Sequence, residues 1–551
     1  MEWRELGGAT TTGIAVVGAG VGGCYTAYRL KFGRAGPPHT PVTLYERSHR
    51  TGGRIRSVAL RGVRGGWADL GAMRLNREAT LVMSLLDHLG LGSRLVPFEF
   101  GRGENLTYVR GTLLRQHQLG DPGSHLPYRL RRRERGYGPD ELTLLAVESA
   151  IGGFQWLRAR YHRAVAHGRR RDAHTHAGVY RSLRDTATVL GRPLNRLAWS
   201  SVLEAALSAE AVRYVDDTGG YDRHGGNAAD WIDVLFHTPP HARYVTLSGG
   251  MQSLPTTLHE SFEAAGGRTC FGHRLCRIDR ATPDPQSVRE APAYELTFAL
   301  EDRAGRDTGD RLRVRAHAVV LALPQGALRH VDGTAFAPTE RLRRNIEAVQ
   351  AVPALKLFLA YAEPWWRERG VTTGRSTTDT PLRQLWYGGI RPPTSPDKGP
   401  ALLLAAYPNG ASAGYWDRFD AGPRYRGPDG EVFDQAPRPS AAMVDHAHEL
   451  LCAMHRVRIR PPLAACWQNW SRPPHEGAWH VWRPNRRSHA IAADMRSPVP
   501  GEAVHVVSDC WTSDPGSIPG VLDCAERVLQ DHLGLAPPVW RNRPTRDRSP
   551  S

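Results

Sequence analysis

The amino-acid sequence predicts an α/β protein built around a dinucleotide-binding unit. An apolar strand-like run at residues 14–17 leads into a glycine-rich turn at residues 18–23, and a helix-like stretch continues through residue 30. A second strand-like run at residues 42–45 ends in an acidic residue, Glu46. Strand, glycine turn, helix, strand and acid in this order are typical of a βαβ unit that binds a dinucleotide.

The glycines of the turn have separate roles. Gly18 permits the tight turn, Gly20 lets the backbone approach a pyrophosphate, and Gly23 lets the helix pack closely on the strand. We expect the pyrophosphate at the N-terminus of the helix, where unpaired N–H groups and the helix dipole favour an anion. Glu46 is then placed to accept hydrogen bonds from the ribose hydroxyls.

A second glycine pair indicates which dinucleotide is bound. Gly52 and Gly53 precede Arg54 shortly after the ribose acid, and a nicotinamide-dependent enzyme has no need of such a segment. The stretch resembles the flavin amine oxidase family, in its branch of L-amino-acid oxidases and tryptophan 2-monooxygenases. The resemblance implies that FAD is the cofactor and that Arg47, Gly53 and Arg54 contact it.

The resemblance extends over nearly the whole chain and implies a division into three parts. A Rossmann-type FAD-binding domain is assembled from non-contiguous segments, which we expect at residues 12–75, 244–330 and 501–535. Residues 76–243, with amphipathic helical spacing, form a helical subdomain at the substrate entrance. Residues 331–500, with strand-like runs rich in Trp and Tyr, form an α+β substrate-binding domain. The remaining residues, 536–551, contain Pro and Arg and are expected to be a disordered tail.

Composition and charge exclude several classes of protein. With 551 residues, 40% of them hydrophobic, the chain is long enough for two or three packed units and is not intrinsically disordered. The net charge of +17 comes almost entirely from Arg, because Lys occurs only at positions 31, 356 and 398. The Arg residues are scattered and no nucleic-acid-binding motif accompanies them, so we expect no nucleic-acid partner.

The cysteines, the histidines and the apolar runs bear on disulfides, metal binding and cellular location. The seven cysteines show no paired metal spacing, and their odd number argues against a complete set of disulfides. The histidines form no cluster with ligand spacing, so we expect no metal. The first residues carry acids and no apolar core, unlike a signal peptide, and no run reaches the ~20 residues that a membrane span needs. We therefore expect a cytoplasmic protein with no membrane partner.

The strongest functional signal lies at residues 67–75. The sequence Gly71, Ala72, Met73, Arg74 resembles the Gly-x-Met-Arg segment of L-amino-acid oxidases. The resemblance implies that this backbone lies against the flavin and that Arg74 binds the α-carboxylate of the substrate. A guanidinium binds a carboxylate through two parallel hydrogen bonds, and it rejects amines that lack this group because its buried charge would stay unpaired. An Arg at the surface or beside the pyrophosphate is the alternative.

Lys356 is the second candidate catalytic residue. It lies within an apolar run at residues 352–358, where a lysine is costly to bury without a partner. The resemblance implies that Lys356 holds a water molecule near flavin N5 and assists the reoxidation of the flavin by oxygen. A buried stem that carries the ammonium group to the surface is the structural alternative.

Three further residues are predicted to contact the cofactor. The resemblance implies that Glu502 closes the cofactor site at the ribityl and pyrophosphate side. It also implies that Ile518 begins a last helix whose backbone amides face the pyrimidine end of the flavin, where negative charge develops on reduction. Leu275, in a strand-like run midway along the chain, is a third predicted contact.

The segment at the start of the last helix departs from the family at two positions: Pro519 replaces an acid, and Ser517 alters the predicted substrate cage. Ser517 stands where the family usually has a Trp or Tyr that flanks the substrate amine. Trp482 or Trp511 could supply the missing ring, or could fill the core instead. The polar segment at residues 216–224 either lines the entrance and selects the side chain or forms a solvated turn.

These features predict an FAD-dependent L-amino-acid oxidase. In this reaction a hydride passes from Cα to flavin N5, O2 reoxidises the flavin to give H2O2, and the imine is hydrolysed to a 2-oxo acid and ammonia. Two alternatives stay open: oxidative decarboxylation of an amino acid to an amide by a monooxygenase, and an amine oxidase or desaturase of a secondary-metabolite pathway. The predicted partners are a small amino-acid substrate and O2, and the resemblance implies a homodimer.

Overall fold

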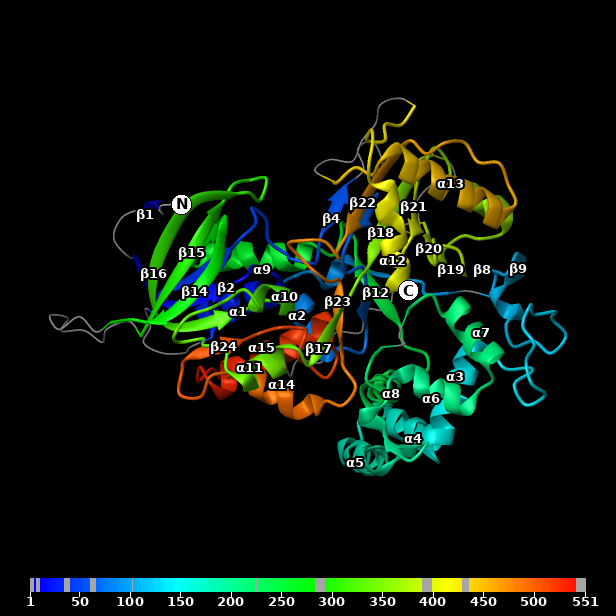
Figure 1. Cartoon of the computed structure of the whole chain (residues 1–551), viewed down its shortest axis with the longest axis horizontal. Helices are drawn as coiled ribbons and strands as arrows, with labels where there is room; N and C mark the ends of the chain where they lie inside the picture. Colours follow the sequence, from blue (N-terminus) through cyan, green and yellow to red (C-terminus); the bar gives the residue numbers. More distant parts are fainter. Residues whose placement is uncertain are drawn as a thin grey trace.

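The structure has three regions that meet at the centre of the view in Figure 1. A large sheet flanked by helices lies on the left, a second sheet lies at the upper right, and a group of helices lies at the lower right. This computed structural model describes residues 4–5, 10–33, 40–59, 66–101, 103–222, 225–282, 293–388, 399–428 and 436–541.

The first region is built on an eight-stranded sheet. Its order is β13–β3–β2–β16–β15–β14, and β1 and β24 also pair with β16. Strands β13, β3, β2, β16 and β24 run parallel, whereas β14 and β15 are antiparallel neighbours at one edge. The strands are β1 (Arg4–Glu5), β2 (Thr10–Val17), β3 (Val42–Glu46), β13 (Arg268–Phe271), β14 (His273–Arg280), β15 (Tyr294–Glu301), β16 (Asp307–Leu321) and β24 (Val504–Val506).

Both faces of this sheet are buried. Because successive residues of a strand point to opposite faces, Val16 packs into one core and Val17 into the other, which explains the continuous apolar run at this strand. The helices that cover the Val16 face are α1 (Val21–Phe32), α2 (Thr80–His88), α9 (Ser253–Ala264) and α15 (Ile518–Asp531). Those on the Val17 face are α10 (Gln325–Leu328), α11 (Glu340–Ile346) and α14 (Ser488–Arg496).

The second region is a seven-stranded sheet in the order β22–β18–β21–β20–β19–β8–β9. The strands are β8 (Leu106–Val109), β9 (Thr112–Arg115), β18 (Leu355–Tyr361), β19 (Gly374–Thr378), β20 (Gln384–Tyr387), β21 (Ala401–Ala406) and β22 (Ala464–Asn469). Its helices are α12 (Ala411–Gly414) and α13 (Ala441–His455), with 3-10 turns at Gln116–Gln118, Trp365–Arg369 and Tyr415–Phe419. The sequence predicts residues 76–243 as a helical part, yet β8 and β9 from that stretch complete this sheet.

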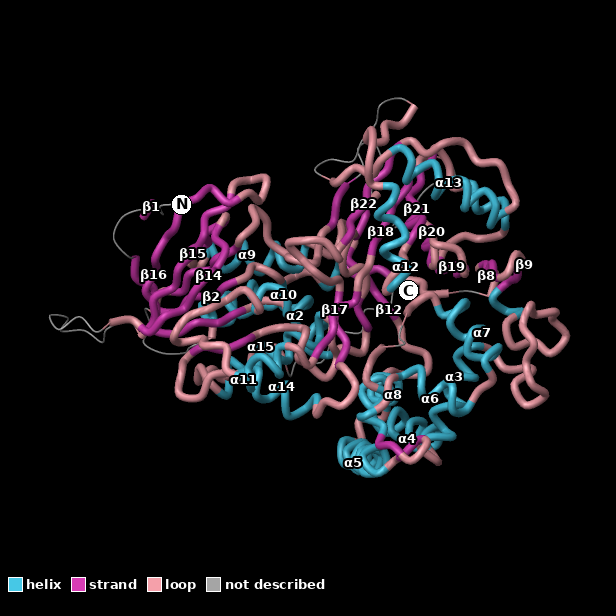
Figure 2. Tube along the Cα trace, viewed as in Figure 1, coloured by secondary structure: helices cyan, strands magenta, loops and turns pink. Residues whose placement is uncertain are grey.

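The third region is a helical unit with its own core, and Figure 2 shows its helices gathered apart from the strands. The helices are α3 (Pro139–Ala150), α4 (Phe154–Ala166), α5 (Arg170–Thr186), α6 (Trp199–Ala206), α7 (Ala209–Gly219) and α8 (Ala228–His237), with a 3-10 turn at Leu194–Arg196 and a hairpin of β10 (Thr188–Val189) and β11 (Arg192–Pro193). Tyr180 and Phe236 stack at 3.8 Å between ring centroids in this core.

Small sheets connect the three regions. A three-stranded sheet joins β6 (Leu75–Asn76), β12 (Tyr244–Leu247) and β7 (Leu95–Pro97), with a 3-10 turn at Gly92–Arg94. Two-stranded ribbons pair β4 (Ser57–Ala59) with β5 (Trp67–Asp69), and β17 (Val349–Val352) with β23 (Trp479–Trp482). In the described parts of the chain, no helix is both long and apolar enough to cross a membrane.

The eight-stranded sheet draws its strands mainly from three separated segments of the chain. The stretches 12–75, 244–330 and 501–535 supply every strand of the eight-stranded sheet except β1 and the first two residues of β2. The predicted disordered tail, 536–551, is wrong in its first part. Trp540 is 4% exposed and stacks on His88 at 5.6 Å between ring centroids, so this segment packs against α2. Residues 542–551 lie outside the described part of the chain.

A buried ion pair ties the first helix of the eight-stranded region to the last. Arg29 of α1 donates from Nε to Oε1 of Glu526 on α15 at 2.6 Å, and these side chains are only 6% and 2% exposed. The hydroxyl of Tyr25 donates to the same oxygen at 2.6 Å. Helices that are almost 500 residues apart in the sequence are therefore joined by charge as well as by apolar packing.

We expect Glu526→Leu to lower the free energy of unfolding by about 3–5 kcal/mol, because it leaves the Arg29 charge buried without its partner. The double variant Arg29→Met, Glu526→Leu should recover most of that loss, since it removes both charges. Urea unfolding of the FAD-loaded protein, followed by circular dichroism, measures both. A double variant no more stable than the single one would show that the pair is not the cause.

Candidate functional site

The glycine turn between β2 and α1 is shaped to receive a pyrophosphate. Gly18 has φ = +101°, which a residue with a side chain rarely adopts. A Cβ on Gly23 would lie 1.8 Å from the carbonyl oxygen of Gly18, so only glycine allows the helix to start here. A Cβ on Gly20 would meet no described atom within 4 Å, and this open side faces the N-terminus of α1, where an anion is favoured.

The acid and the second glycine pair lie beside this turn. Glu46 ends β3, and its Oε2 accepts a hydrogen bond from the amide of Ala19 at 2.7 Å. The amide of Gly52 donates to the carbonyl of Ala19 at 2.8 Å, and a Cβ on Gly53 would lie 3.2 Å from Cα of Gly20. The two glycine segments therefore approach each other closely along one groove, as a dinucleotide site requires.

Three predicted cofactor residues occupy different surroundings near this groove. Arg47 forms a bidentate ion pair with the buried Glu301, so its charge is committed to the protein rather than to a ligand. Arg54 pairs with Asp509 and donates to the carbonyl of Ala478 at 3.0 Å. Leu275 lies in β14 and is 7% exposed, within the apolar core on the Val17 face of the sheet.

Glu502 does not lie at the cofactor edge, which corrects the prediction for this residue. It precedes β24, so it lies at the amino end of the parallel strands, where its Oε1 accepts a hydrogen bond from Nε of Arg280 at 2.6 Å. Ligands of such sheets bind beyond the carboxyl ends of the strands. The acid that follows the carboxyl end of β24 is Asp509, the partner of Arg54. Its position just after the apolar run 504–507 is the sequence signal that could have identified it.

The segment from Gly71 to Arg74 crosses in front of this groove. A Cβ on Gly71 would lie 1.8 Å from the carbonyl oxygen of Arg54, and the amide of Ala72 donates to that oxygen at 3.2 Å. Met73 is 6% exposed and packs in the core beneath the seven-stranded sheet. Close packing of this backbone against the second glycine segment fixes where Arg74 emerges.

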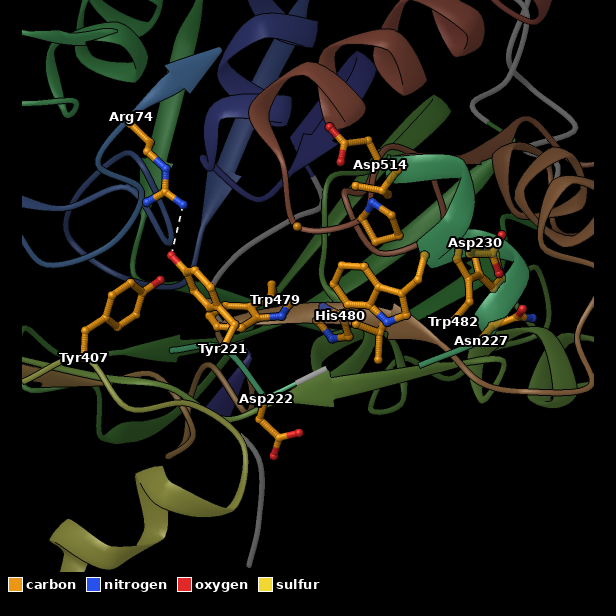
Figure 3. Close-up of a pocket in the computed structure, with 15 residues that line it drawn as sticks. Arg74, Tyr221, Asp222, Asn227, Asp230, Tyr407, Trp479, His480, Trp482 and Asp514 are labelled. Carbon is orange, nitrogen blue, oxygen red and sulfur yellow. Dashed lines mark hydrogen bonds between the residues drawn. The ribbon is translucent and has the colours of Figure 1, made fainter. Parts of the chain in front are cut away.

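Arg74 projects into a cavity of about 270 Å³ (Figure 3). Its guanidinium donates to the hydroxyl of Tyr221 at 3.0 Å and lies 4.9 Å from the ring centre of Phe100 and 5.4 Å from that of Trp386. Among the described residues, no carboxylate forms an ion pair with Arg74. The cavity therefore presents an uncompensated, bidentate cation to whatever enters it.

Lys356 is buried directly behind the same segment. Its side chain lies in β18, is 2% exposed, and donates from Nζ to the carbonyls of Asp69 at 2.9 Å and Gly71 at 2.6 Å. Burial lowers the pKa of Lys356 from its ordinary value, although the Asp69 carboxylate opposes the shift. Burial likewise raises the pKa of Asp69, whose Oδ2 has no hydrogen-bond partner among the described atoms. An ammonium has three donors, so one N–H of Lys356 remains for a ligand or a water molecule.

Aromatic rings from all three regions line the cavity. Tyr221 follows α7, Tyr407 follows β21, and Trp479 and Trp482 belong to β23. The sequence left the segment 216–224 open between an entrance wall and a solvated turn, and Tyr221 lines the cavity. Trp482 also lines it, which is one of the two alternatives that the sequence left open for this residue. Trp511 is not among the lining residues; it is 2% exposed and donates from Nε1 to the carbonyl of Asn345 at 2.9 Å.

Ser517, which stands where the family has an aromatic ring, forms the N-terminal cap of a helix. Ser517 caps α15: its hydroxyl accepts from the amide of Gly520 at 2.9 Å and donates to the carbonyl of Asp514 at 2.9 Å. Ser517 itself is not among the lining residues, whereas Pro515 and Gly516 are. Ile518 is the first residue of α15 and is 7% exposed, so the helix begins with its backbone amides beside the cavity.

One group of potential metal ligands lies beside the cavity among the described residues: His480, Asp509 and Cys510. Sequence spacing could not reveal it, because the residues come from β23 and from the loop after β24. His480 Nδ1 lies 3.2 Å from Cys510 Sγ, and Asp509 is already paired with Arg54. Burial raises the pKa of Cys510 to about 12, so the thiol keeps its proton at neutral pH when no metal is bound.

Known proteins resemble this chain over most of its length. The sequence profile described as flavin containing amine oxidoreductase matches residues 22–529. Aplysianin-A from Aplysia kurodai is 27% identical over 549 residues, which cover 95% of this chain and 90% of the relative. An L-amino-acid oxidase from Mus musculus is 27% identical over 401 residues, covering 72% of this chain and 53% of the relative.

Solved structures share the fold. A triple mutant of putrescine oxidase superimposes with a TM-score of 0.62 at 17% identity, covering 95% of this chain and 99% of that chain. The predicted fold class, the predicted family resemblance and the predicted cofactor, FAD, are confirmed by these matches. The open side of Gly20, the free N-terminus of α1 and the acid at the end of β3 fit this cofactor.

We expect Gly23→Ala to lower the FAD content of the purified protein roughly tenfold or more, because the added methyl group collides with the Gly18 carbonyl and opens the turn. The ratio of visible flavin absorbance to protein absorbance measures the content. Gly178→Ala in α5 is the matched control, since a Cβ there meets no described atom within 4 Å. Full FAD occupancy in Gly23→Ala would contradict the close-approach role of this glycine.

Proposed function

The chain belongs to the flavin containing amine oxidoreductase family, and on that basis we propose that it is an L-amino-acid oxidase. The observation that carries the proposal is Arg74, a cation with no carboxylate partner among the described residues, which faces the cavity. Relatives named L-amino-acid oxidase support the same activity. Two further proposals, a cytoplasmic location and a homodimer, rest on the sequence alone.

The proposed reaction balances without a side-chain nucleophile. The amino acid loses two electrons and two protons to become an imino acid, O2 becomes H2O2, and water hydrolyses the imine to a 2-oxo acid and ammonia. Bound FAD supplies the electron transfer from substrate to oxygen. The residues of the chain bind the substrate, orient it and place charge near the reacting atoms.

Arg74 binds and orients the substrate in this proposal. Its fork of N–H groups receives the α-carboxylate through two parallel hydrogen bonds, which fixes the position and the rotation of Cα. The hydroxyl of Tyr221 accepts one N–H of Arg74, and this contact holds the guanidinium at the wall of the cavity where the carboxylate would bind. An amine without a carboxylate would leave the Arg74 charge desolvated and unpaired, which gives selectivity for amino acids.

Lys356 assists the step with oxygen in this proposal. Two carbonyl acceptors hold its ammonium group against the backbone that borders the cavity, and the remaining N–H can hold a water molecule. A positive charge at this place stabilises the negative charge that develops as oxygen is reduced. The same environment lowers the pKa of Lys356, so the charge is present only below that lowered pKa.

The function is tested by mixing the FAD-loaded protein, without oxygen, with L-amino acids and with the corresponding decarboxylated amines. We expect an amino acid, and not its amine, to bleach the flavin absorbance. In Arg74→Ala, the second-order rate constant for flavin bleaching by the amino acid should fall roughly 10³-fold or more, whereas that for the amine should change little.

The matched control is Arg418→Ala. Its guanidinium likewise lies over an aromatic ring, 4.4 Å from that of Tyr415, and it is not among the residues that line the cavity. An unchanged preference for amino acid over amine in Arg74→Ala would contradict the role of this residue. Product mass separates the oxidase from the decarboxylating alternative, since a 2-oxo acid retains the carboxyl carbon that an amide has lost.

We expect Lys356→Met to slow flavin reoxidation by about 10²-fold while changing flavin reduction much less. In the unaltered protein, reoxidation should slow as pH rises through the lowered pKa of Lys356, because the ammonium loses its proton there. The variant should show no such pH dependence. Stopped-flow mixing of the reduced enzyme with oxygenated buffer measures the rate of reoxidation, and mixing with substrate without oxygen measures the rate of reduction. Equal losses in the two rates would refute the assignment.

A further inference from the structure

A second cavity, of about 320 Å³, lies in the region of the seven-stranded sheet. It is bounded by β8, β9, the 3-10 turn at Trp365–Arg369 and the C-terminus of α13. Strands β8 and β9 and helix α13 are labelled at the right of Figure 1. None of its lining residues is shared with the cavity that contains Arg74. Its volume lies at the lower end of the ~300–1,000 Å³ typical of small-molecule sites.

Three guanidinium groups give this second cavity a positive charge. Arg115 donates to the carbonyl of Arg369 at 2.7 Å, and Arg369 donates to the carbonyl of Arg456 at 2.7 Å. These acceptors are neutral, and among the described residues no carboxylate pairs with any of the three arginines. His455 adds no charge at neutral pH, since burial and the nearby Arg369 lower its pKa to about 4.

Three leucines and two polar residues, Gln118 and His455, complete the lining of the second cavity. Leu106 is 3% exposed and Leu113 packs against the same core, whereas Leu114, 6% exposed, belongs to the core of the helical region. A small hydrated anion would not need this surface, whereas a neutral apolar ligand would leave three clustered cations without a counter-charge. We propose that the second cavity binds an amphipathic organic anion, with its acidic group at the arginines and its apolar part on the leucines.

A single strand connects this cavity with Arg74. His455 lines the cavity and its Nε2 lies 2.8 Å from the hydroxyl of Tyr387 in β20. The neighbouring residue, Trp386, has its ring centre 5.4 Å from the Arg74 guanidinium. Successive residues point to opposite faces of a strand, so β20 has the second cavity on one side and Arg74 on the other. A bound anion that moves His455, and through it Tyr387, is therefore expected to alter substrate binding, a consequence that rests on the proposed function.

Calorimetric titration of the FAD-loaded protein with octanoate tests the binding. We expect saturable binding of octanoate. Its affinity should be about tenfold or more weaker in the double variant Arg115→Gln, Arg369→Gln, because each lost guanidinium removes a charged hydrogen-bond donor. Arg456→Gln is a gentler variant, since the Arg456 guanidinium makes no described hydrogen bond to the protein, and it should also weaken binding. Arg306→Gln, an 81% exposed arginine paired with Asp302, is the matched control and should bind as the unaltered protein does.

Two comparison ligands separate the parts of the proposal. Octanamide has the same chain without the charge, and inorganic phosphate has charge without the chain; we expect each to bind at least tenfold more weakly than octanoate. Equal binding of octanamide, equal binding of phosphate, or unchanged octanoate binding in the arginine variants would overturn the site. A substrate KM that does not respond to saturating octanoate, in an enzyme that oxidises amino acids, would overturn only the connection through β20.

Discussion

The arrangement of the candidate active site depends on one stretch of backbone, residues 69–74, which is held on both sides. From one side, Lys356 and Trp470 donate to carbonyls of this stretch, the indole at 2.7 Å. From the other side, amides of the stretch donate to the carbonyls of Arg54 and Arg56. Side chains of the seven-stranded region and backbone carbonyls near the second glycine segment thus hydrogen-bond to the same six residues. Arg74, the last of the six, points into the cavity.

Because of these hydrogen bonds, Arg74, which is proposed to bind the substrate, and the second glycine segment, which is expected to contact the cofactor, are held by the same stretch of backbone. Lys356 holds this backbone through Nζ, the same nitrogen whose charge the proposed reaction uses. A change of that charge would therefore also affect the hydrogen bonds that position the backbone. Arg74 comes just before β6, whereas the rings around it come from several other segments, including Phe100 after β7, Trp386 of β20 and Tyr221 after α7. A site of this kind exists only when all three regions are folded against one another.

The parts of the site that depend on local backbone could be predicted from the sequence. Gly18 and Gly23 are required by contacts within a single turn, and the apolar surroundings of Lys356 are visible in its own strand. The Glu502 prediction failed because it rested on a dipeptide rather than on the direction of the strand. Asp509 follows the same apolar run at its carboxyl end, where a parallel sheet places its ligands.

Other features could not be read from sequence, because they arise where distant segments meet. Tyr221 lies in a polar, glycine-containing stretch that is equally consistent with a solvated turn, and only packing against β21 and β23 turns its ring to Arg74. The sequence gives Trp511 and Trp482 the same alternatives, and both pack in one apolar core, yet only Trp482 also lines the cavity. In contrast, the cap formed by Ser517 is local, and a serine just before a helix with an early proline is a recognisable start signal.

The link between α7 and α8 has a consequence for how Tyr221 is held at the cavity. Its carbonyls at Gly219 and Gly220 accept hydrogen bonds from Arg375 and Gln384 of the seven-stranded sheet. The amide of Asn227, at its far end, donates to the carbonyl of Trp482 in β23 at 2.8 Å. The described ends of this link are therefore anchored to the neighbouring parts of the chain, so a movement that carried Tyr221 away from the cavity would have to break these hydrogen bonds.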